Sequence, residues 1–311
     1  MTGIPKRTLG RTGLEVTTLG YGAMELRGAP RGPEVSETEA ATILNAVLDL
    51  GINYIDTSPD YGKSEELIGK TIAGRRSEYF LASKCGCIVG DAVPPTAANQ
   101  PNPHVFTAAM VRAGVEQSLS RMRTTYLDLV QFHASPSREQ LEAEGALEEL
   151  QALQREGKVR FLGMSGVLPN LREQVAMGVF DAFQIPYSAI QREHEAVISD
   201  ASTAGAGVII RGGAARGAPS DWQNRASRLV PADAEDRWNG AKIDDLLDGM
   251  TPMEFTLRFT LSNPDLDTTI VGTRNIEHLR GNVAVAATGP LPDDVMAEAK
   301  RRLTAAGSAP E

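Results

Sequence analysis

The sequence predicts an α/β fold in which eight parallel strands, each followed by a helix, close into a (β/α)8 barrel. Short apolar runs alternate with helical segments along the whole chain, eight of these runs read as strands, and the runs show little polar alternation. Parallel strands that helices cover on the outer face have this continuous apolar character. The expected strands are 17–20, 53–55, 79–82, 127–132, 159–164, 182–185, 208–210 and 268–271.

Start and stop signals predict helices between these strands. Thr251 precedes Pro252, which combines a capping side chain with a proline at the first helical position. Gly51 and Gly157 stand where helix C-termini are expected, because glycine readily takes the conformation that ends a helix. Three further helices are expected to begin at pairs in which a capping side chain precedes Glu or Gln by three residues: Ser36 and Glu39, Ser137 and Gln140, and Asn170 and Glu173.

Some segments fall outside the strand–helix repeat. Residues 7–20 read as a β-hairpin that turns at Gly13 and closes the bottom of the barrel, and a helix over 292–305 is additional at the C-terminal end. The segments 85–104 and 211–239 are long and irregular, which in a compact domain usually indicates a functional or mobile loop. No linker divides the sequence, so residues 1–311 are expected to form a single barrel domain.

Composition excludes several classes of protein. The formal net charge of −9 argues against binding of nucleic acid or of an anionic membrane surface. The sequence shows no signal peptide and no run long enough to span a bilayer. Two cysteines, Cys85 and Cys87, suit a reducing compartment better than a disulfide framework. We therefore expect a cytoplasmic protein, a monomer or small homo-oligomer, with a small-molecule partner.

Four ionisable residues lie at or just after the ends of predicted strands: Asp56, Tyr61, Lys84 and His133. In a (β/α)8 barrel the carboxyl ends of the strands converge on one face, which holds the active site. Taken singly, these residues would more often be a turn residue, a packing residue, a surface charge and a core histidine. Together they predict a catalytic group for proton transfer.

Tyr61 is the expected proton donor. A free phenol has a pKa near ~10 and is a weak acid at neutral pH. An ammonium about 4 Å away stabilises the phenolate by roughly 4 kcal/mol at an effective dielectric constant of 20, or ~3 pK units. We therefore expect Lys84 to lower the pKa of Tyr61 toward neutrality. The negative charge of Asp56 offsets part of the lysine's effect, so the shift should be smaller than this value. Asp56 would keep the lysine charged, and His133 would orient and polarise a substrate oxygen atom by hydrogen bonding.

The end of the eighth predicted strand has the features of a phosphate site. Gly272, Thr273 and Arg274 follow this strand, and a helix opens at Asn275. Backbone N–H groups of glycine-rich turns and helix N-termini bind phosphate, and barrels often hold phosphate at this place. The guanidinium of Arg274 suits a phosphate group, such as a ribose 2′-phosphate; a surface cap or ion pair is the alternative.

Five segments together identify a family. GINYIDTSPDYGKSEELIGK, LASK, LDLVQFH, FLGMSG and VGTRN occur in the order found in aldo-keto reductases, and the chain resembles that family over essentially its whole length. The resemblance implies a TIM barrel that reduces carbonyl compounds with a nicotinamide cofactor, usually NADP(H). With such a cofactor, the guanidinium of Arg274 would bind the ribose 2′-phosphate, which favours NADPH over NADH. A histidine at the position of His133 implies carbonyl reduction, whereas a glutamate there marks the branch that reduces conjugated double bonds.

The resemblance also implies which residues bind the cofactor. Ser165 and Gln184 would hold the nicotinamide carboxamide, and His278 and Asn282 would face the adenosine, although the family often has a glutamate where this chain has Gly281. The expected cofactor-binding residues are Gly22, Ala23, Met24, Asp56, Ser165, Gln184, Arg211, Gly212, Gly213, Gly217, Gly272, Thr273, Arg274, His278 and Asn282.

The seventh strand departs from the family pattern. Many relatives have an aromatic residue and Ser-Pro at its end, and the ring stacks on nicotinamide; this chain has VIIRGGAARG. Arg211 takes the place of the aromatic residue, and the glycines after it still suit a loop near the pyrophosphate. We hypothesise that Arg211 lies against the nicotinamide and disfavours its positively charged oxidised form. A salt bridge away from the ring is the alternative.

No metal site is expected from the spacing of potential ligands. Cys85 and Cys87 supply too few ligands, so we expect them to have a packing role or an incidental redox sensitivity, and we expect His104 to be an ordinary loop residue. The residues expected to line the substrate site are Met24, Leu26, Cys85, Ile88, Trp222 and Trp238.

The leading interpretation is an NADPH-dependent oxidoreductase that reduces an aldehyde or ketone by hydride transfer, with Tyr61 as general acid. Aromatic residues make up only 5% of the chain, which gives little support to a pocket that stacks a steroid-like substrate. Only a few residues follow the last predicted helix, so we expect no long C-terminal specificity loop and an open site for small aldehydes, ketones or sugars. The alternatives are a sugar or alcohol dehydrogenase acting in the oxidative direction, a Schiff-base lyase or isomerase, and a cofactor-sensing regulatory subunit like some members of the family. Pairing of Lys84 with Asp56 would oppose the depressed pKa that a Schiff-base lysine needs.

Overall fold

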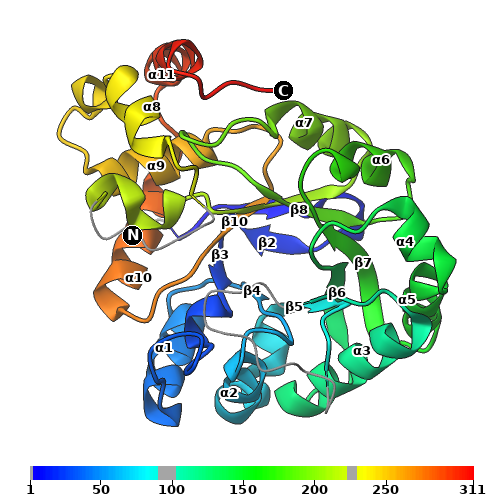
Figure 1. The fold of residues 1–311 in the computed structure, drawn as a ribbon. Coiled ribbons are helices and arrows are strands. Elements are labelled where there is room, and N and C mark those ends of the chain that lie inside the picture. The colour runs from blue at the N-terminus through cyan, green and yellow to red at the C-terminus, as the bar shows by residue number, and fades with distance from the viewer. Residues whose placement is uncertain (1–2, 90–102, 223–229) are drawn as a thin grey trace.

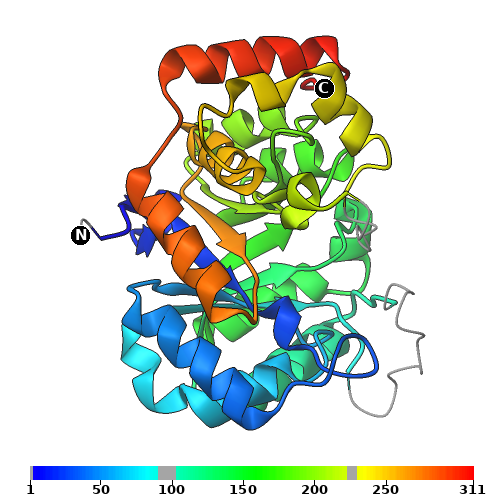
Figure 2. The ribbon, with the colours of Figure 1, turned by 90° about the vertical axis from the view of Figure 1, so that its left-hand side faces the viewer.

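A computed structural model describes residues 3–89, 103–222 and 230–311. Its eight parallel strands close into a barrel in the order β10-β3-β4-β5-β6-β7-β8-β9, and helices surround them (Figures 1 and 2). The predicted (β/α)8 barrel is therefore confirmed. The barrel strands are β3 (Leu19–Gly22), β4 (Tyr54–Asp56), β5 (Phe80–Cys85), β6 (Leu127–Phe132), β7 (Val159–Ser165), β8 (Ala182–Pro186), β9 (Gly207–Arg211) and β10 (Thr268–Val271).

Most of the predicted helix starts are confirmed. Ser36 and Ser137 each form a complete capping box, and the Thr251 side chain accepts the N–H of Glu254. The expected cap at Asn170 is wrong, because its side-chain amide donates instead to the carbonyl of Ser135. The helices are α1 (Glu37–Asp49), α2 (Ser64–Thr71), α3 (Ala108–Met122), α4 (Arg138–Ala143), α5 (Ala146–Arg155), α6 (Asn170–Ala176), α7 (Glu195–Thr203), α8 (Ala234–Gly240), α9 (Pro252–Leu261), α10 (Ile276–Thr288) and α11 (Asp293–Ala305).

The N-terminal hairpin closes one end of the barrel, as predicted. Its strands β1 (Lys6–Thr8) and β2 (Glu15–Thr17) pair in antiparallel register, and Gly13 takes a left-handed φ of +68°. Leu9 at its turn is buried against the start of β9. The expected strand 17–20 was misplaced by two residues, because Thr17 pairs within the hairpin and the barrel strand begins at Leu19.

The interior of the barrel is layered. Side chains two residues apart on a strand point to the same face. The layer above the hairpin is apolar, and it contains Tyr54, Ala82, Leu129, Ala182 and Ile209. Two residues further along the same five strands stand polar side chains: Asp56, Lys84, Gln131, Gln184 and Arg211. The fold thus carries a polar ring at the carboxyl ends of the strands, directly above an apolar floor.

Two predicted loops are described only in part. Residues 90–102 and 223–229, within the predicted irregular segments 85–104 and 211–239, lie outside the described residues. The additional C-terminal helix α11 is confirmed and packs beside α8 on the outside of the barrel (Figures 1 and 2). None of the helices in the described ranges is both long enough and apolar enough to cross a membrane.

Close packing of α2 against α3 makes a specific prediction about stability. A Cβ at Gly69 would lie 2.1 Å from the backbone oxygen of Arg121, so we expect Gly69→Ala to destabilise the protein by about 2 kcal/mol or more. The matched control is Gly74→Ala, since Gly74 is exposed and a Cβ there meets nothing within 4 Å. Urea denaturation measures both variants, and equal stabilities would contradict the packing described here.

Candidate active site

Asp56 is the centre of the polar ring. Its Oδ1 accepts a hydrogen bond from Lys84 Nζ at 2.7 Å, and its Oδ2 accepts one each from Gln131 Nε2 and Gln184 Nε2 at 2.9 Å. Lys84 Nζ also donates to the carbonyl oxygen of Thr57 at 2.8 Å. Asp56 and Lys84 are each only 1% exposed. The carboxylate therefore joins side chains from β4, β5, β6 and β8 in one buried network.

Burial and neighbouring charges shift the pKa values of Lys84 and Tyr61 in opposite directions. Burial lowers the pKa of Lys84, but attraction to Asp56 and Tyr61 outweighs it and raises the pKa above its usual value, which keeps the ammonium charged. Burial raises the pKa of Tyr61, and the Lys84 ammonium, 5.1 Å from the centre of the ring, lowers it only in part. The predicted net lowering of the phenol pKa is therefore wrong, although the sign of the lysine's effect is right.

His133 lies next to Tyr61, with its ring 6.2 Å from the tyrosine ring and nearly perpendicular to it. Burial lowers the pKa of His133 to about 3, and the nearby carboxylate of Asp60 opposes this only in part. The imidazole is thus neutral near pH 7. The structure brings all four predicted catalytic residues to one end of the barrel: Asp56, Tyr61, Lys84 and His133.

Sequence reasoning missed three neighbours of His133. The side chains of Asp60, Cys87 and His104 surround its Nδ1, and His104 Nε2 is the nearest at 3.1 Å. Cys87 and His104 therefore contact a predicted catalytic residue, which the sequence did not lead us to expect. Cys87 and His104 are 17 residues apart, and no sequence motif predicts that they meet. An antiparallel bridge between their backbones brings them together in the fold.

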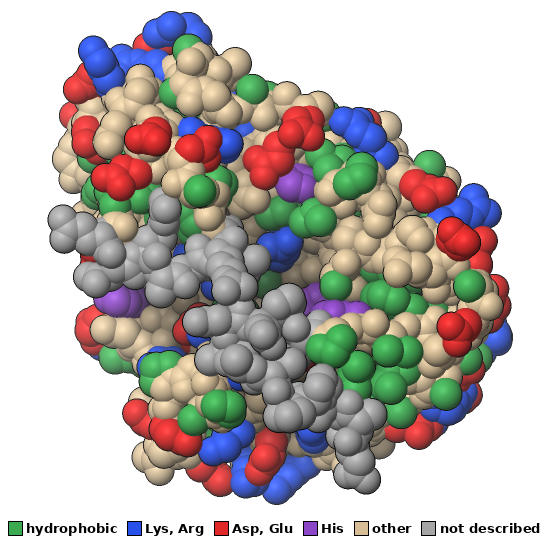
Figure 3. Space-filling view, in the orientation of Figure 1, with side chains coloured by type: hydrophobic (Ala, Val, Ile, Leu, Met, Phe, Trp, Pro, Cys, Tyr) green, Lys and Arg blue, Asp and Glu red, His purple; other side chains and the backbone are tan. Residues whose placement is uncertain are grey.

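A cavity of about 880 Å³ opens from the polar ring toward α10. Figure 3 shows this face of the molecule with a hollow in which basic and histidine side chains are visible. Ala23, Ser165 and Gly213 are predicted cofactor-binding residues that do not line the cavity. The predicted residues that do line it are Gly22, Met24, Asp56, Tyr61, Gln184, Arg211, Gly212, Gly217, Gly272, Thr273, Arg274, His278 and Asn282.

Ser165 and Gln184 are engaged with each other. Ser165 Oγ donates to Gln184 Oε1 at 3.1 Å, while the amide nitrogen of Gln184 donates to Asp56. Gln131 was missed as a member of the ring, and its Oε1 is buried without a hydrogen-bond partner among the described residues. Its place at an inward position of β6, two residues before His133, is the signal that could have found it.

Two arginines of the β9 end face the cavity. Arg211 and Arg216 both line it, and neither forms an ion pair with another described residue. Arg216 was missed by sequence reasoning; it has a left-handed φ of +53° in the Gly- and Ala-rich loop after β9, which shows no periodicity from which to place it. Burial lowers the pKa of Arg211, and attraction to Tyr61 opposes this only in part. Arg211 is half-buried and Arg216 is exposed, and guanidinium groups without an ion-pair partner can bind an anionic ligand.

Backbone N–H groups at the start of α10 are not free to bind a phosphate. Asn275 caps this helix, and its Oδ1 accepts the N–H groups of Glu277 and His278. Thr273 Oγ1 accepts the N–H of Asn275. These backbone donors, which the sequence suggested would be free for phosphate, therefore already have partners. Arg274, which lines this end of the cavity, can supply further hydrogen-bond donors.

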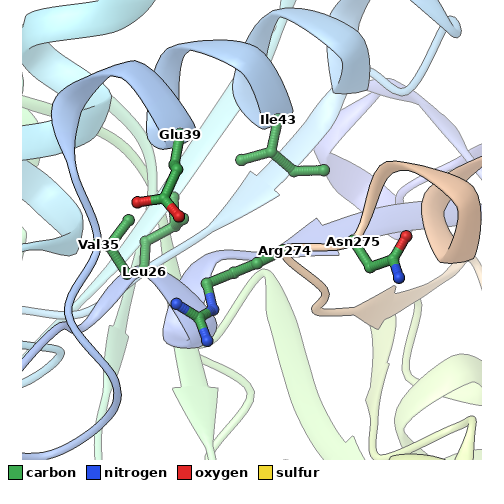
Figure 4. A pocket seen from close by; sticks show the side chains of 6 residues that line it. All are labelled: Leu26, Val35, Glu39, Ile43, Arg274 and Asn275. Carbon is green, nitrogen blue, oxygen red and sulfur yellow. The ribbon is translucent and has the colours of Figure 1, made fainter.

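Arg274 lines both the large cavity and a smaller pocket of about 340 Å³ next to α1. Figure 4 shows Arg274 and Glu39 reaching into this pocket from opposite sides. Arg274 Nη1 donates to the backbone oxygen of Glu34 at 3.1 Å. Hydrogen bonds from Ser36 lower the pKa of Glu39, and Arg274 adds a smaller effect in the same direction.

Several predicted substrate-site residues are part of the core instead. Leu26 and Cys85 are fully buried, and Trp238 packs its ring against Trp222 and Phe255. Met24 is the expected wall residue that does line the large cavity. These positions were misjudged because the sequence shows which loop a side chain belongs to, but not which way it turns.

Comparison with known proteins supports one class. The sequence model of the Aldo/keto reductase family matches residues 18–303. The chain is 28% identical over 300 residues to an uncharacterized oxidoreductase, YqkF, of Bacillus subtilis, with 93% of each chain covered. It is 30% identical over 306 residues to L-galactose dehydrogenase of Arabidopsis thaliana, with 91% of this chain and 88% of that protein covered.

A solved structure agrees with these matches. The holo form of the aldo-keto reductase AKR11C1 from Bacillus halodurans aligns with a TM-score of 0.81 at 27% identity, and 96% of each chain is covered. The fold and the site thus define an oxidoreductase built on a (β/α)8 barrel. The chain belongs to the aldo/keto reductase family, whose members generally use NAD(P)H and act on small carbonyl compounds.

The buried ion pair predicts a large effect on stability. Lys84→Met leaves the Asp56 carboxylate buried without its cation, so we expect a loss of about 3–5 kcal/mol. The double variant Asp56→Asn/Lys84→Met should be more stable than Lys84→Met alone, because no charge is left unpaired. Urea denaturation of the three proteins measures this. Lys63→Met, at an exposed ion pair with Glu34, is the control and should change stability by no more than about 0.5 kcal/mol; equal losses at both lysines would contradict the prediction.

Proposed function

We propose that the protein is an NADPH-dependent reductase of small aldehydes or ketones, in which Tyr61 protonates the carbonyl oxygen. The observation that carries the proposal is the buried Lys84–Asp56 pair beside a half-buried phenol that lines a large cavity. A charged lysine near a phenol stabilises the phenolate that forms when the proton leaves.

The residues that line the cavity fit a dinucleotide. Its volume of about 880 Å³ lies within the range of ligand sites, and three arginines face it: Arg211, Arg216 and Arg274. We propose that these cations hold the phosphates and that Gln184 and Asn282 contact the two ends of the dinucleotide. When bound, the reduced nicotinamide would supply the hydride for the carbonyl carbon.

The chain's own groups would then handle the proton. Tyr61 is protonated at neutral pH, because its pKa is raised, and can donate its proton to the oxygen as negative charge develops there. Lys84, which the Asp56 carboxylate keeps charged, stabilises the resulting phenolate. His133 is neutral and can donate one hydrogen bond to the same oxygen, which orients the carbonyl without adding charge.

A second candidate function is oxidation of a sugar. It is favoured by the 30% identity to L-galactose dehydrogenase, which covers 91% of this chain. The same groups would run in reverse, with the Tyr61 phenolate accepting the proton of the alcohol. The buried free thiols Cys85 and Cys87 support a reducing compartment such as the cytoplasm for either reaction.

The proposal predicts a kinetic phenotype for Tyr61. Tyr61→Phe should lower kcat/KM for NADPH-dependent reduction by at least about 100-fold, because positioned proton transfer contributes ~10²–10⁴-fold. NADPH consumption across aldehydes, ketones and α-dicarbonyls measures this, and the dissociation constant of NADPH should stay unchanged. The control is Tyr54→Phe, since Tyr54 lies in the apolar floor and its hydroxyl has no partner among the described residues.

The pH profile tests the same assignment. Reduction requires the protonated phenol, and burial raises its pKa above the ordinary ~10. The rate of reduction in the wild type should therefore stay level from about pH 7 to pH 9. A fall in this rate near neutral pH that is absent in Tyr61→Phe would mean that the phenol is far more acidic than the structure implies.

A protein that binds NADPH but turns over none of these substrates would instead support the regulatory-subunit alternative.

The cofactor assignment predicts selectivity at Arg274. Arg274→Gln should weaken NADPH binding by about 10–100-fold, because a charge-assisted hydrogen bond contributes roughly 1.5–3 kcal/mol, and it should change NADH binding little. Arg280→Gln is the control, since Arg280 lies on α10, six residues after Arg274, but pairs with Glu277 and does not line the cavity. Fluorescence titration with both nucleotides measures this, and equal losses for NADH and NADPH would refute a contact to the 2′-phosphate.

A further inference from the structure

Four potential metal ligands of three chemical types converge beside the polar ring. Asp60, Cys87, His104 and His133 each offer one ligand atom, and all four atoms lie within 4.8 Å of one another. Asp60 follows β4, Cys87 follows β5 and His133 follows β6, so three neighbouring strands supply three of the four. His104 joins them through its antiparallel bridge to Cys87.

Three of these groups approach a single nitrogen. His104 Nε2 is 3.1 Å, Cys87 Sγ 3.4 Å and Asp60 Oδ2 3.7 Å from His133 Nδ1. A ring nitrogen either donates one hydrogen bond or accepts one. A hydrogen bond therefore accounts for only one of the three short distances to His133 Nδ1. A metal ion at the centre of the four ligand atoms accounts for all three.

We propose that Asp60, Cys87, His104 and His133 form a binding site for a divalent zinc-type cation. Zinc is bound by thiolate, imidazole and carboxylate groups, and four protein ligands are typical of a closed, structural site. The site is distinct from the proposed dinucleotide cavity, whose lining includes none of the four residues.

The distances suit tetrahedral coordination. With zinc–ligand bonds of about 2.0–2.3 Å, the ligand atoms of a regular tetrahedron lie about 3.3–3.8 Å apart. Of the three separations from His133 Nδ1, those to Cys87 Sγ (3.4 Å) and Asp60 Oδ2 (3.7 Å) lie within that range, and the one to His104 Nε2 (3.1 Å) is slightly shorter. The widest separation in the cluster is no more than 4.8 Å, so a shift of about an ångström in one side chain completes the coordination.

The charges of the ligands match those of the cation. Asp60 as carboxylate and Cys87 as thiolate supply two negative charges, and the two imidazoles are neutral ligands, so a divalent cation gives a neutral complex. Neutrality matters because Cys87 is buried, and an uncompensated charge in such a place carries a large desolvation cost. Binding requires loss of the thiol proton, which leaves to solvent as the zinc–sulfur bond forms.

Neighbouring groups orient the ligands. Ser58, which is buried, donates its hydroxyl to Asp60 Oδ1 at 2.6 Å, and this leaves Oδ2 as the oxygen nearer to His133. The ring of His104 stacks on Phe106 with their centres 6.3 Å apart. Outer partners of this kind fix the direction in which metal ligands point.

The site has a consequence for the reaction, and this consequence rests on the proposed function. A cation on Nδ1 of His133 places the remaining proton on Nε2. His133 would then be a fixed hydrogen-bond donor toward the active site.

Metal binding can be measured without any assay of activity. Tag-free protein is stripped with a chelator, loaded with Zn²⁺ and desalted, and its metal content is determined by mass spectrometry. We expect about one zinc per chain, and a Co²⁺-loaded sample should show a thiolate-to-cobalt charge-transfer band together with the intense visible bands of tetrahedral cobalt.

The chain offers a matched pair of cysteine variants. Cys87→Ser should abolish the charge-transfer band, whereas Cys85→Ser should retain it, because Cys85 is two residues away and packs in the hydrophobic core. His104→Ala should weaken Zn²⁺ binding by more than about 100-fold, since even outer partners of a metal ligand are worth 10–100-fold. Circular dichroism checks that each variant is folded.

Three results would overturn the site. They are a zinc content far below one per chain after loading, a cobalt spectrum without a thiolate band, and equal Zn²⁺ affinity in the wild type and in folded His104→Ala. The last result would mean adventitious binding at the surface. None of these results depends on whether Tyr61 is the general acid, so failure of the metal site and failure of the proposed reductase activity are distinguishable.

Discussion

The active site depends on one buried interaction, the ion pair between Lys84 and Asp56. Both side chains are removed from water, so their charges are tolerable only with near-complete hydrogen bonding. The carboxylate accepts three hydrogen bonds, and the ammonium donates to Asp56 and to the Thr57 carbonyl oxygen. Removal of any one partner leaves a buried charge short of a hydrogen bond. The same network that stabilises the pair therefore fixes where the ammonium stands relative to the phenol.

The two-residue repeat of the strands positions this network. On each of five strands an apolar residue of the floor is followed, two positions later, by a member of the polar ring, as in Tyr54 and Asp56 or Ala82 and Lys84. A shift of one residue in strand register would turn the polar residue outward against the helices. The N-terminal hairpin seals the floor from below, which keeps water from the ion pair on that side.

The sequence predicted the parts of the structure that depend on local pattern. The apolar runs gave the eight strands within a few residues, and inward-facing polar residues at strand ends gave the catalytic group. It did not predict features that depend on what surrounds a group in three dimensions. The raised pKa of Tyr61 comes from burial by the whole barrel mouth, and Asn170 caps nothing because a carbonyl from another loop takes its amide.

The same distinction explains the cluster around His133. Cys87 and His104 are 17 residues apart with no local motif between them, and only the pairing of their backbones brings both to a residue at the end of β6. Spacing arguments detect metal ligands that share one helix or one turn. They do not detect ligands that different strand ends of a barrel bring together.

The strand order separates two electrostatic regions at the mouth of the barrel. The cluster of Asp60, Cys87, His104 and His133 follows β4, β5 and β6, whereas Arg211 ends β9 and Arg274 follows β10, on the other side of the ring. The whole chain carries a net charge of −9, which repels an anionic ligand at long range. Salt screens such long-range effects beyond about 10 Å, so the arginines that line the cavity determine the local potential. Tyr61 lies beside both regions, since it lines the cavity and its ring also meets that of His133, and it can therefore contact a substrate carbonyl held between them.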